Sequence, residues 1–156
     1  LLTRGLTATR ADPLDLEARM NCQLGAWLSM SSVQANVPKG ASHAIGHILG
    51  GSFGVAHGHT SCVMLPSVMR WNLEADTAGR QKLISAAMGD AGQPAGDLLE
   101  AFIRGLGMPT RLSEVGVTPD QFERAAKLSM HDRWIHTNPR PIKSPDQVLE
   151  ILKLAA

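Results

Sequence analysis

The sequence predicts an all-α fold in which several helices form one domain, and three observations support this prediction. Apolar residues recur at the three- and four-residue spacing of a helix in several segments. Two segments open with Thr or Ser followed by Pro and then Gln, a pattern typical of helix starts. No run of alternating apolar and polar residues is long enough to predict a strand. The 156 residues, 44% of them hydrophobic, can bury one core, so we expect a single helical domain over residues 1–156.

The first helix is predicted to begin at Asp12 and Pro13 and to end before Pro38. Asp caps the free amides of a first turn, and Pro fits the first helical position because it has no N–H that would go unbonded there. An apolar stripe then follows at helical spacing: Leu16, Met20, Leu24, Trp27 and Leu28. Such periodicity is typical of packing, so we expect this stripe to lie in the core.

A short helix after Pro38 is predicted to carry His43 and His47. The glycine-rich segment that follows breaks this helix and lets the chain return, and the next helix then runs over about residues 58–70. Pro66 lies inside that apolar segment. It predicts a kink or a helix boundary, because Pro removes one backbone hydrogen bond and clashes with the preceding turn.

The remaining segments carry weaker helical signals. Thr118 and Ser144 each open a capping box, with Gln121 and Gln147 at the third helical position. The predicted elements are helices over residues 80–88 and 97–106, a turn or short helix over 113–117, a helix over 122–130 and a last helix that ends near Leu154. No unit repeats at a fixed period, so the sequence does not predict a solenoid.

Four of the six histidines lie within the seventeen residues from His43 to His59. His43 and His47 are four residues apart, so on a helix they share one face, and the glycine-rich turn can bring His57 back to them. Neutral imidazole binds zinc, iron and nickel and also transfers protons near neutral pH, so the cluster predicts a metal site, an acid-base site or both. Ala44 stands where a zincin peptidase has its Glu, which disfavours that class of enzyme.

The same segment contains an unusual number of glycines: Gly46, Gly50, Gly51, Gly54 and Gly58. Each weakens a helix by roughly 1 kcal/mol relative to Ala. A segment that only packs would seldom carry so many. We therefore expect the backbone to approach a ligand or a neighbouring helix closely here.

Composition excludes several classes of function. The formal net charge is +1 and no basic run interleaves with aromatic residues, so we expect neither nucleic acid nor a membrane surface as a partner. No segment approaches the roughly 20 apolar residues of a membrane span, and the start of the chain does not resemble a signal peptide. Cys22 and Cys62 are too few for a disulfide framework, so we expect buried free thiols and a cytoplasmic location.

Several motifs have the spacing of a known family. They are the histidines His43, His47 and His57; the segments Cys62-Val63-Met64-Leu65-Pro66, Arg70-Trp71-Asn72 and Asn138-Pro139-Arg140-Pro141; Asp132, six residues before Asn138; and the opening Asp12-Pro13-Leu14-Asp15-Leu16-Glu17-Ala18-Arg19 with Gly25-Ala26-Trp27-Leu28. With them the chain resembles the C-terminal helical half of the iron-containing alcohol dehydrogenase family, and more closely its maleylacetate reductase branch. The resemblance covers nearly the whole chain.

The resemblance implies roles for individual residues. In metal-dependent members the first and third histidines bind the metal, which implies His43 and His57 as ligands of an iron or zinc ion. The middle histidine, His47, would carry a proton beside the nicotinamide and the substrate. Maleylacetate reductase relatives commonly work without the ion, so the metal is left open. Arg140 offers a planar fork of donors that suits a substrate carboxylate, and the alternative is an exposed Arg in a stiff turn.

The resemblance also implies a function for the complete enzyme, namely hydride transfer between NAD or NADP and a small carbonyl or enoate substrate. In the family, a nucleotide-binding half and two further metal ligands precede the matched region. We therefore expect this chain to be part of a larger enzyme, inactive alone and weak in metal binding, with the cofactor bound mainly by the other half. A homodimer is left open.

Two alternatives belong to other classes of protein. One is a non-catalytic helical fragment or assembly module that retains the histidine cluster as a relic. The other is a distinct helical metalloprotein that uses His43, His47, His57 and His59 as ligands. Nicotinamide binding or alcohol oxidation would separate the enzyme from the module, and a stoichiometric metal ion would support the metalloprotein.

Overall fold

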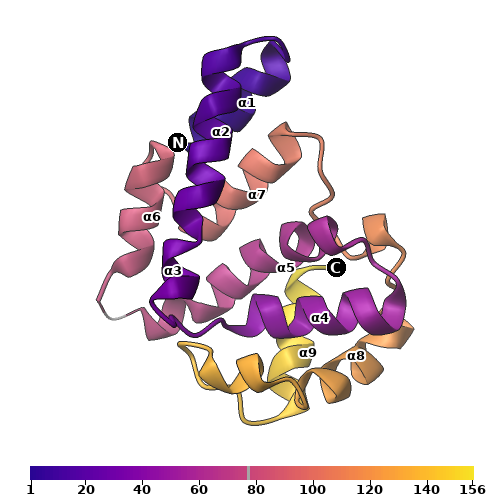
Figure 1. The fold of residues 1–156 in the computed structure, drawn as a ribbon. Helices are drawn as coiled ribbons and strands as arrows, with labels where there is room; N and C mark the ends of the chain where they lie inside the picture. The colour runs from indigo at the N-terminus through magenta and orange to yellow at the C-terminus, as the bar shows by residue number, and fades with distance from the viewer. Residues whose placement is uncertain (77) are drawn as a thin grey trace. The chain divides into compact units, whose positions relative to one another are not determined.

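A computed structural model describes residues 1–76 and 78–156, and all regular elements in this part of the chain are helices (Figure 1). The predicted all-α class is therefore confirmed. The chain divides into two compact units, Leu1–Pro38 and Lys39–Ala156, which are called the N-terminal and the C-terminal unit below. The expected single domain over residues 1–156 stays a prediction. No helix among the described residues combines the length and the apolar character needed to cross a lipid bilayer.

The N-terminal unit is a hairpin of two helices followed by a single helical turn. α1 (Leu2–Ala11) and α2 (Leu16–Ser29) pack on each other, and α3 (Ser31–Gln34) follows α2. The sequence does not predict α1, because this helix has neither a side-chain cap nor a clear apolar period.

The start of α2 differs from the prediction. Its N-cap is Asp15, whose Oδ1 accepts a hydrogen bond of 2.9 Å from the N–H of Ala18. Asp12 instead shapes the turn between the two helices, because its Oδ1 accepts a 2.9 Å hydrogen bond from the N–H of Leu14. Both aspartates are good caps, and the preceding helix α1 decides which of them is used.

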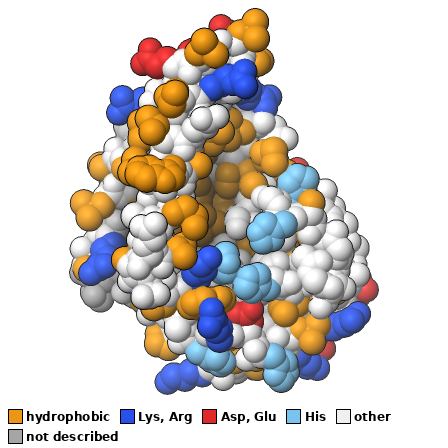
Figure 2. Space-filling model, in the orientation of Figure 1, with side chains coloured by type: hydrophobic (Ala, Val, Ile, Leu, Met, Phe, Trp, Pro, Cys, Tyr) orange, Lys and Arg blue, Asp and Glu red, His pale blue; other side chains and the backbone are white. Residues whose placement is uncertain are grey.

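The apolar stripe of α2 is exposed, so the prediction that it lies in the core is wrong. All five of its residues are exposed, Leu16 to 77% and Trp27 to 70%. Figure 2 shows hydrophobic side chains along the surface of this hairpin. The reason is that α1 covers a different face of α2, on which Ala18 and Gly25 are the buried residues. The helical spacing of the apolar residues identifies an amphipathic helix, but it does not show which element covers the apolar face.

The C-terminal unit is built around a pair of packed helices, α4 (Ala41–Phe53) and α5 (His57–Asn72). Where the sequence predicts the bounds of a helix in this unit, the structure differs by no more than two residues. The sequence does not predict two of the short elements, η1 (Leu73–Ala75) and η4 (Arg133–Thr137). The other elements are α6 (Arg80–Met88), α7 (Ala95–Gly105), α8 (Phe122–Ser129), α9 (Pro145–Leu154) and the short 3-10 helices η1 (Leu73–Ala75), η2 (Ser113–Val115), η3 (Pro119–Gln121) and η4 (Arg133–Thr137).

The core of the C-terminal unit lies between α4, α5, α8 and α9. Burial of one Leu, Ile or Met side chain contributes about 1.5–3 kcal/mol, so this core fixes the orientation of each helix around its own axis. On α4 the buried side chains face away from the histidines. The side chains with 0% exposure include Ile45 and Leu49 of α4, Val63 and Met64 of α5, Ala125 of α8, and Val148, Ile151 and Leu152 of α9.

Two glycines of the histidine segment have a structural role. Gly46 lets α4 approach α5 closely, because a Cβ at this position would lie only 3.1 Å from Oγ1 of Thr60. Gly54 has a φ of 71°, the left-handed conformation that ends α4. The predicted close approach to a neighbouring helix is therefore confirmed at Gly46. Gly51 and Gly58 have open space where a Cβ would stand, so packing does not explain them.

Most local signals act as predicted. Both capping boxes form, with Gln121 accepting from the N–H of Thr118 at 3.0 Å and Gln147 accepting from the N–H of Ser144 at 3.3 Å. Pro66 marks no boundary and lies buried inside α5. The two cysteines are free thiols, as expected, but both are only partly buried.

The buried amide of Asn138 ties the loop 138–141 to α4 and α5. Its Oδ1 accepts hydrogen bonds from the N–H of Ala41 at 3.1 Å and from Nδ2 of Asn72 at 3.3 Å. Its Nδ2 donates to Oδ1 of Asn72 at 2.6 Å and to the carbonyl of Arg140 at 2.7 Å. The amide thus uses its two donors and both lone pairs of its oxygen. Because Ala41 is the first residue of α4, this contact sets where the histidine helix begins.

A buried carboxylate, Glu100 of α7, lies between three arginines. Its Oε2 accepts from Arg70 at 2.5 Å, and its Oε1 accepts from Arg104 at 2.6 Å and Arg111 at 3.2 Å. Burial raises the pKa of Glu100, but the hydrogen bond and charge of Arg70 and the charges of the other two arginines lower it, and the result lies below the ordinary value. The network joins α5, α7 and the segment before η2.

Replacement of Glu100 by Gln should destabilise the protein by on the order of 2 kcal/mol at pH 7, because three cations lose their shared partner. A carboxylate with a lowered folded pKa adds stability above its unfolded pKa, and this stability is lost as the pH falls through the folded pKa. The difference between wild type and E100Q should therefore shrink below about pH 4. Urea unfolding across this range measures it. Asp97→Asn, which removes a more exposed partner of Arg70, should cost about 1 kcal/mol or less.

Replacement of Asn138 by Ala should lower the free energy of unfolding by on the order of 3 kcal/mol, because it leaves the buried N–H of Ala41 and partly buried groups of Asn72 and Arg140 without partners. Urea unfolding at neutral pH measures the loss. Gln93→Ala is the matched control, since the exposed side-chain amide of Gln93 donates a hydrogen bond to the exposed Asp90. Equal losses in the two variants would show that the buried amide does not hold the loop.

Candidate functional site

His43 and His47 lie on the same face of α4, one turn apart. Their ring centroids are 4.7 Å apart and the ring planes meet at 69°, which is an edge-to-face contact. The side chain of His47 is 42% exposed, and His43 is partly buried. Figure 2 shows several imidazoles on the face of the molecule in view. The core contacts of Ile45 and Leu49 hold the histidine face of α4 outward.

His57 is the first residue of α5, and its side chain is exposed. Within the described residues, the hydrogen bonds and ring contacts of His43 and His47 do not include it. His59 follows on the same helix and is partly buried. The structure thus brings two of the three predicted histidines into contact, and the third lies at the start of the neighbouring helix, where its charge contributes to lowering the pKa of His43.

Lys39 contacts the first of these imidazoles. Its Nζ lies 3.2 Å from Nε2 of His43. A lysine ammonium only donates hydrogen bonds, so Nε2 accepts here and the ring of His43 is neutral in this contact. The pKa of His43 is lowered, first by burial and then by the positive charges of Lys39 and His47.

Asp132 contacts the second imidazole. Its Oδ2 lies 2.7 Å from Nδ1 of His47, and its Oδ1 accepts a 2.8 Å hydrogen bond from the N–H of Trp134 at the start of η4. The carboxylate is 14% exposed. Burial raises the pKa of Asp132, but the hydrogen bonds of His47 and Trp134 lower it, and the result lies below the ordinary value. Asp132 is therefore ionised at neutral pH.

These four side chains form a row with a cation at one end and a carboxylate at the other. Lys39 is hydrogen-bonded to His43, the ring of His43 contacts the ring of His47, and His47 is hydrogen-bonded to Asp132. An imidazole oriented by a carboxylate is well suited to donate or accept a proton near neutral pH. The row can therefore perform acid-base chemistry at the exposed ring of His47.

The described residues do not contain three His, Cys, Asp or Glu side chains grouped closely enough to hold a metal ion. Of the two predicted ligands, His43 already accepts a hydrogen bond from Lys39 at Nε2. An ammonium beside that nitrogen repels a second cation. Since catalytic zinc or iron usually needs three protein ligands, this part of the chain does not by itself fit a metal centre.

Arg140 is held by contacts within the C-terminal unit. Its guanidinium lies 4.0 Å from the ring centroid of Trp71 and donates to the carbonyl of Trp71 at 2.8 Å. It also forms an ion pair of 2.8 Å with Glu74. A substrate carboxylate would have to compete with Glu74 for this fork, so substrate binding by Arg140 stays a prediction.

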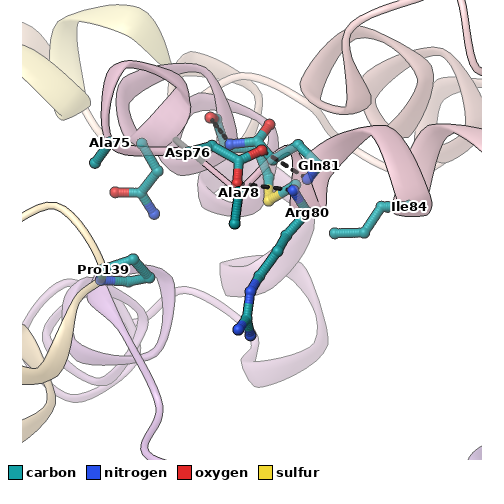
Figure 3. A pocket seen from close by; sticks show the side chains of 9 residues that line it. Ala75, Asp76, Ala78, Arg80, Gln81, Ile84 and Pro139 are labelled. Carbon is teal, nitrogen blue, oxygen red and sulfur yellow. Dashed lines mark hydrogen bonds between the residues drawn. The ribbon is translucent and has the colours of Figure 1, made fainter.

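A pocket of about 370 Å³ lies elsewhere in the C-terminal unit (Figure 3). Several of its polar groups are already used in the fold: Asp76 accepts from the N–H groups of Arg80 and Gln81, and Gln81 donates to the carbonyl of Met69. Figure 3 shows Pro139 and Ile84 facing the same space. None of the predicted site residues lines this pocket, so it adds no chemistry to the histidine site.

Sequence reasoning did not assign roles to Lys39 and Asp132. Lys39 lies four residues before His43, the spacing of helical neighbours, and this spacing could have indicated the contact. Asp132 lies 85 residues from His47, and no spacing rule relates residues so far apart. Only its place in the motif before Asn138 drew attention to it.

Comparison with known proteins gives one family. Residues 1–156 match the family model described as Fe-containing alcohol dehydrogenase family, C-terminal. Dehydrogenase FUM7 of Gibberella moniliformis is 37% identical over an aligned length of 135 residues, and the match covers 75% of this chain and 31% of that protein. Maleylacetate reductase 1 of Cupriavidus pinatubonensis is 31% identical over 134 residues, which are 86% of this chain and 36% of that protein.

Solved structures agree with this match. The crystal structure of maleylacetate reductase from Agrobacterium tumefaciens superimposes with a TM-score of 0.81 at 29% sequence identity, over 98% of this chain and 43% of that one. The chain thus spans less than half the length of the relatives it matches. The family model covers every residue, and the relatives share its helical region. The chain therefore belongs to the Fe-containing alcohol dehydrogenase family, within the C-terminal region of that family.

Proposed function

We propose that this chain forms the catalytic helical part of a nicotinamide-dependent oxidoreductase of the alcohol dehydrogenase or maleylacetate reductase type. The reaction is hydride transfer between NAD or NADP and a small carbonyl or enoate substrate. Membership of the family supports an oxidoreductase, and the similarity to maleylacetate reductases supports the enoate type. The observation that carries the proposal is the imidazole of His47, which is exposed on α4 and held by Asp132.

His47 moves the proton in this mechanism. When bound, a reduced nicotinamide supplies a hydride to the acceptor carbon, so the acceptor oxygen or the adjacent carbon must gain a proton. An imidazole nitrogen can either carry a proton or accept one, so His47 can give this proton during reduction and take it back during alcohol oxidation. Because its ring is 42% exposed, a substrate can reach it.

His43 and His57 polarise the acceptor oxygen in this mechanism. Metal coordination by these two residues stays a prediction, and no step depends on it. Imidazole N–H groups and the ammonium of Lys39 beside His43 can stabilise negative charge as it develops on the substrate oxygen.

A non-catalytic helical module that assembles with another chain is the alternative. One observation favours it, namely the exposed apolar stripe of α2, which includes Leu16 and Trp27. A larger enzyme would also explain this stripe, because a further domain could cover it. Nicotinamide binding separates the two functions.

Replacement of His47 by Asn should lower kcat/KM by about 10²- to 10⁴-fold at neutral pH, because the proton carrier is lost while a polar side chain of similar reach remains. The longest in-frame product that contains this chain is assayed for NADH and NADPH oxidation with maleylacetate and with short aldehydes. Binding of the nucleotide is measured in parallel by calorimetry.

His131→Asn is the matched control, since His131 is an exposed imidazole in the turn after α8. This variant should keep the wild-type kcat/KM. Equal activity of H47N and wild type would remove His47 from the mechanism. A product that binds neither nucleotide and turns over no substrate would favour the assembly module.

A further inference from the structure

We propose that Asp132 is a positioning residue that fixes the tautomer of His47, with the proton on Nδ1, so that Nε2 is the nitrogen that exchanges protons with a substrate. The inference rests on the proposed function for the role of His47, but the tautomer itself is a property of the chain alone. The two can therefore be tested separately.

The hydrogen bond between the two side chains fixes where the proton lies. Oδ2 of Asp132 lies 2.7 Å from Nδ1 of His47, and a carboxylate at neutral pH only accepts hydrogen bonds. Nδ1 must therefore carry a proton. In a neutral imidazole the other nitrogen, Nε2, then has a free lone pair, and no described residue donates a hydrogen bond to it.

The carboxylate of Asp132 is itself held in place. Its Oδ1 accepts a hydrogen bond of 2.8 Å from the N–H of Trp134 and thereby caps η4. η4 packs on α4, and Oγ1 of Thr137 at its other end donates to the carbonyl of Lys39. Asp132 therefore cannot turn away from His47 without losing the cap.

The ring of His47 has little freedom to turn over. The ring of His43 lies edge-to-face against it, with centroids 4.7 Å apart. Flipping the ring of His47 would exchange Nδ1 for a carbon and would leave the Asp132 carboxylate without its partner. An oriented imidazole with one defined tautomer is what general acid-base catalysis requires.

The Asp132→Asn variant tests the inference, because the cap decides which way the new amide points. Oδ1 of the amide stays on the N–H of Trp134, since two N–H groups would clash there, and the NH₂ group then takes the place of Oδ2. An NH₂ group donates, so Nδ1 of His47 must become the acceptor. The proton should move to Nε2, which inverts the tautomer.

Two-bond ¹H–¹⁵N correlation spectra of the ¹⁵N-histidine-labelled chain at about pH 8.5, where imidazole is neutral, identify the protonated nitrogen. The signal of His47 is assigned by its loss in the H47N variant. The expected result is protonated Nδ1 in wild type and protonated Nε2 in D132N. Asp146→Asn, which changes an exposed carboxylate in the first turn of α9, should leave the tautomer unchanged.

Protonated Nε2 or a mixture of tautomers in wild type would overturn the inference, and this result does not depend on whether D132N folds. A wild-type Nδ1 tautomer that persists in folded D132N would also overturn it, because Asp132 would then not be what fixes the proton. In active protein, D132N should lower kcat by about 10²-fold or more with little change in KM. Loss of activity in H47N without the expected tautomers would leave the proposed function standing and remove Asp132 from it.

Discussion

The hydrogen bonds of the buried Asn138 amide hold three segments together, and the placement of the histidine site depends on them. Asn138 directly follows η4, and its Oδ1 accepts a hydrogen bond from the N–H of Ala41, the first residue of α4. The same amide pairs with Asn72 at the end of α5. One side chain therefore fixes where α4 starts, where α5 ends and where η4 lies. Because a buried amide is costly when unpaired, moving any of these segments away from Asn138 would lower the free energy of unfolding.

The connection at Asn138 explains how Lys39 and Asp132, the two ends of the row of four side chains, are both placed beside the histidines. η4 contacts the histidine segment at both of its ends: its N-cap Asp132 is hydrogen-bonded to the ring of His47 on α4, and Thr137 donates to the carbonyl of Lys39, two residues before α4. The cation and the carboxylate of the row are thus both positioned by one short helix. The core under α4 supplies the other half of the constraint, since buried Ile45 turns the histidines outward. Orientation of the imidazoles is therefore a property of packing as much as of hydrogen bonding.

Local signals allowed much of the C-terminal unit to be predicted from the sequence. Capping boxes at Thr118 and Ser144 depend on atoms within three residues of each other, so they work wherever the chain folds. The contact of His43 with His47 follows from helical spacing in the same way. The N-terminal unit was less predictable, because Asp12 and Asp15 are equally good caps and the choice between them depends on α1.

The sequence by itself determined the helical class, the bounds of most helices of the C-terminal unit and the shared face of His43 and His47. These features depend on interactions over a few residues. Only the tertiary structure decided that Asp132 bonds His47, that the guanidinium of Arg140 lies on Trp71, and that the stripe of α2 is exposed. The reason is physical: a helical period shows that a face is apolar, and a carboxylate shows that it can accept a hydrogen bond, but neither shows which distant segment it meets. That is decided by how the helices pack.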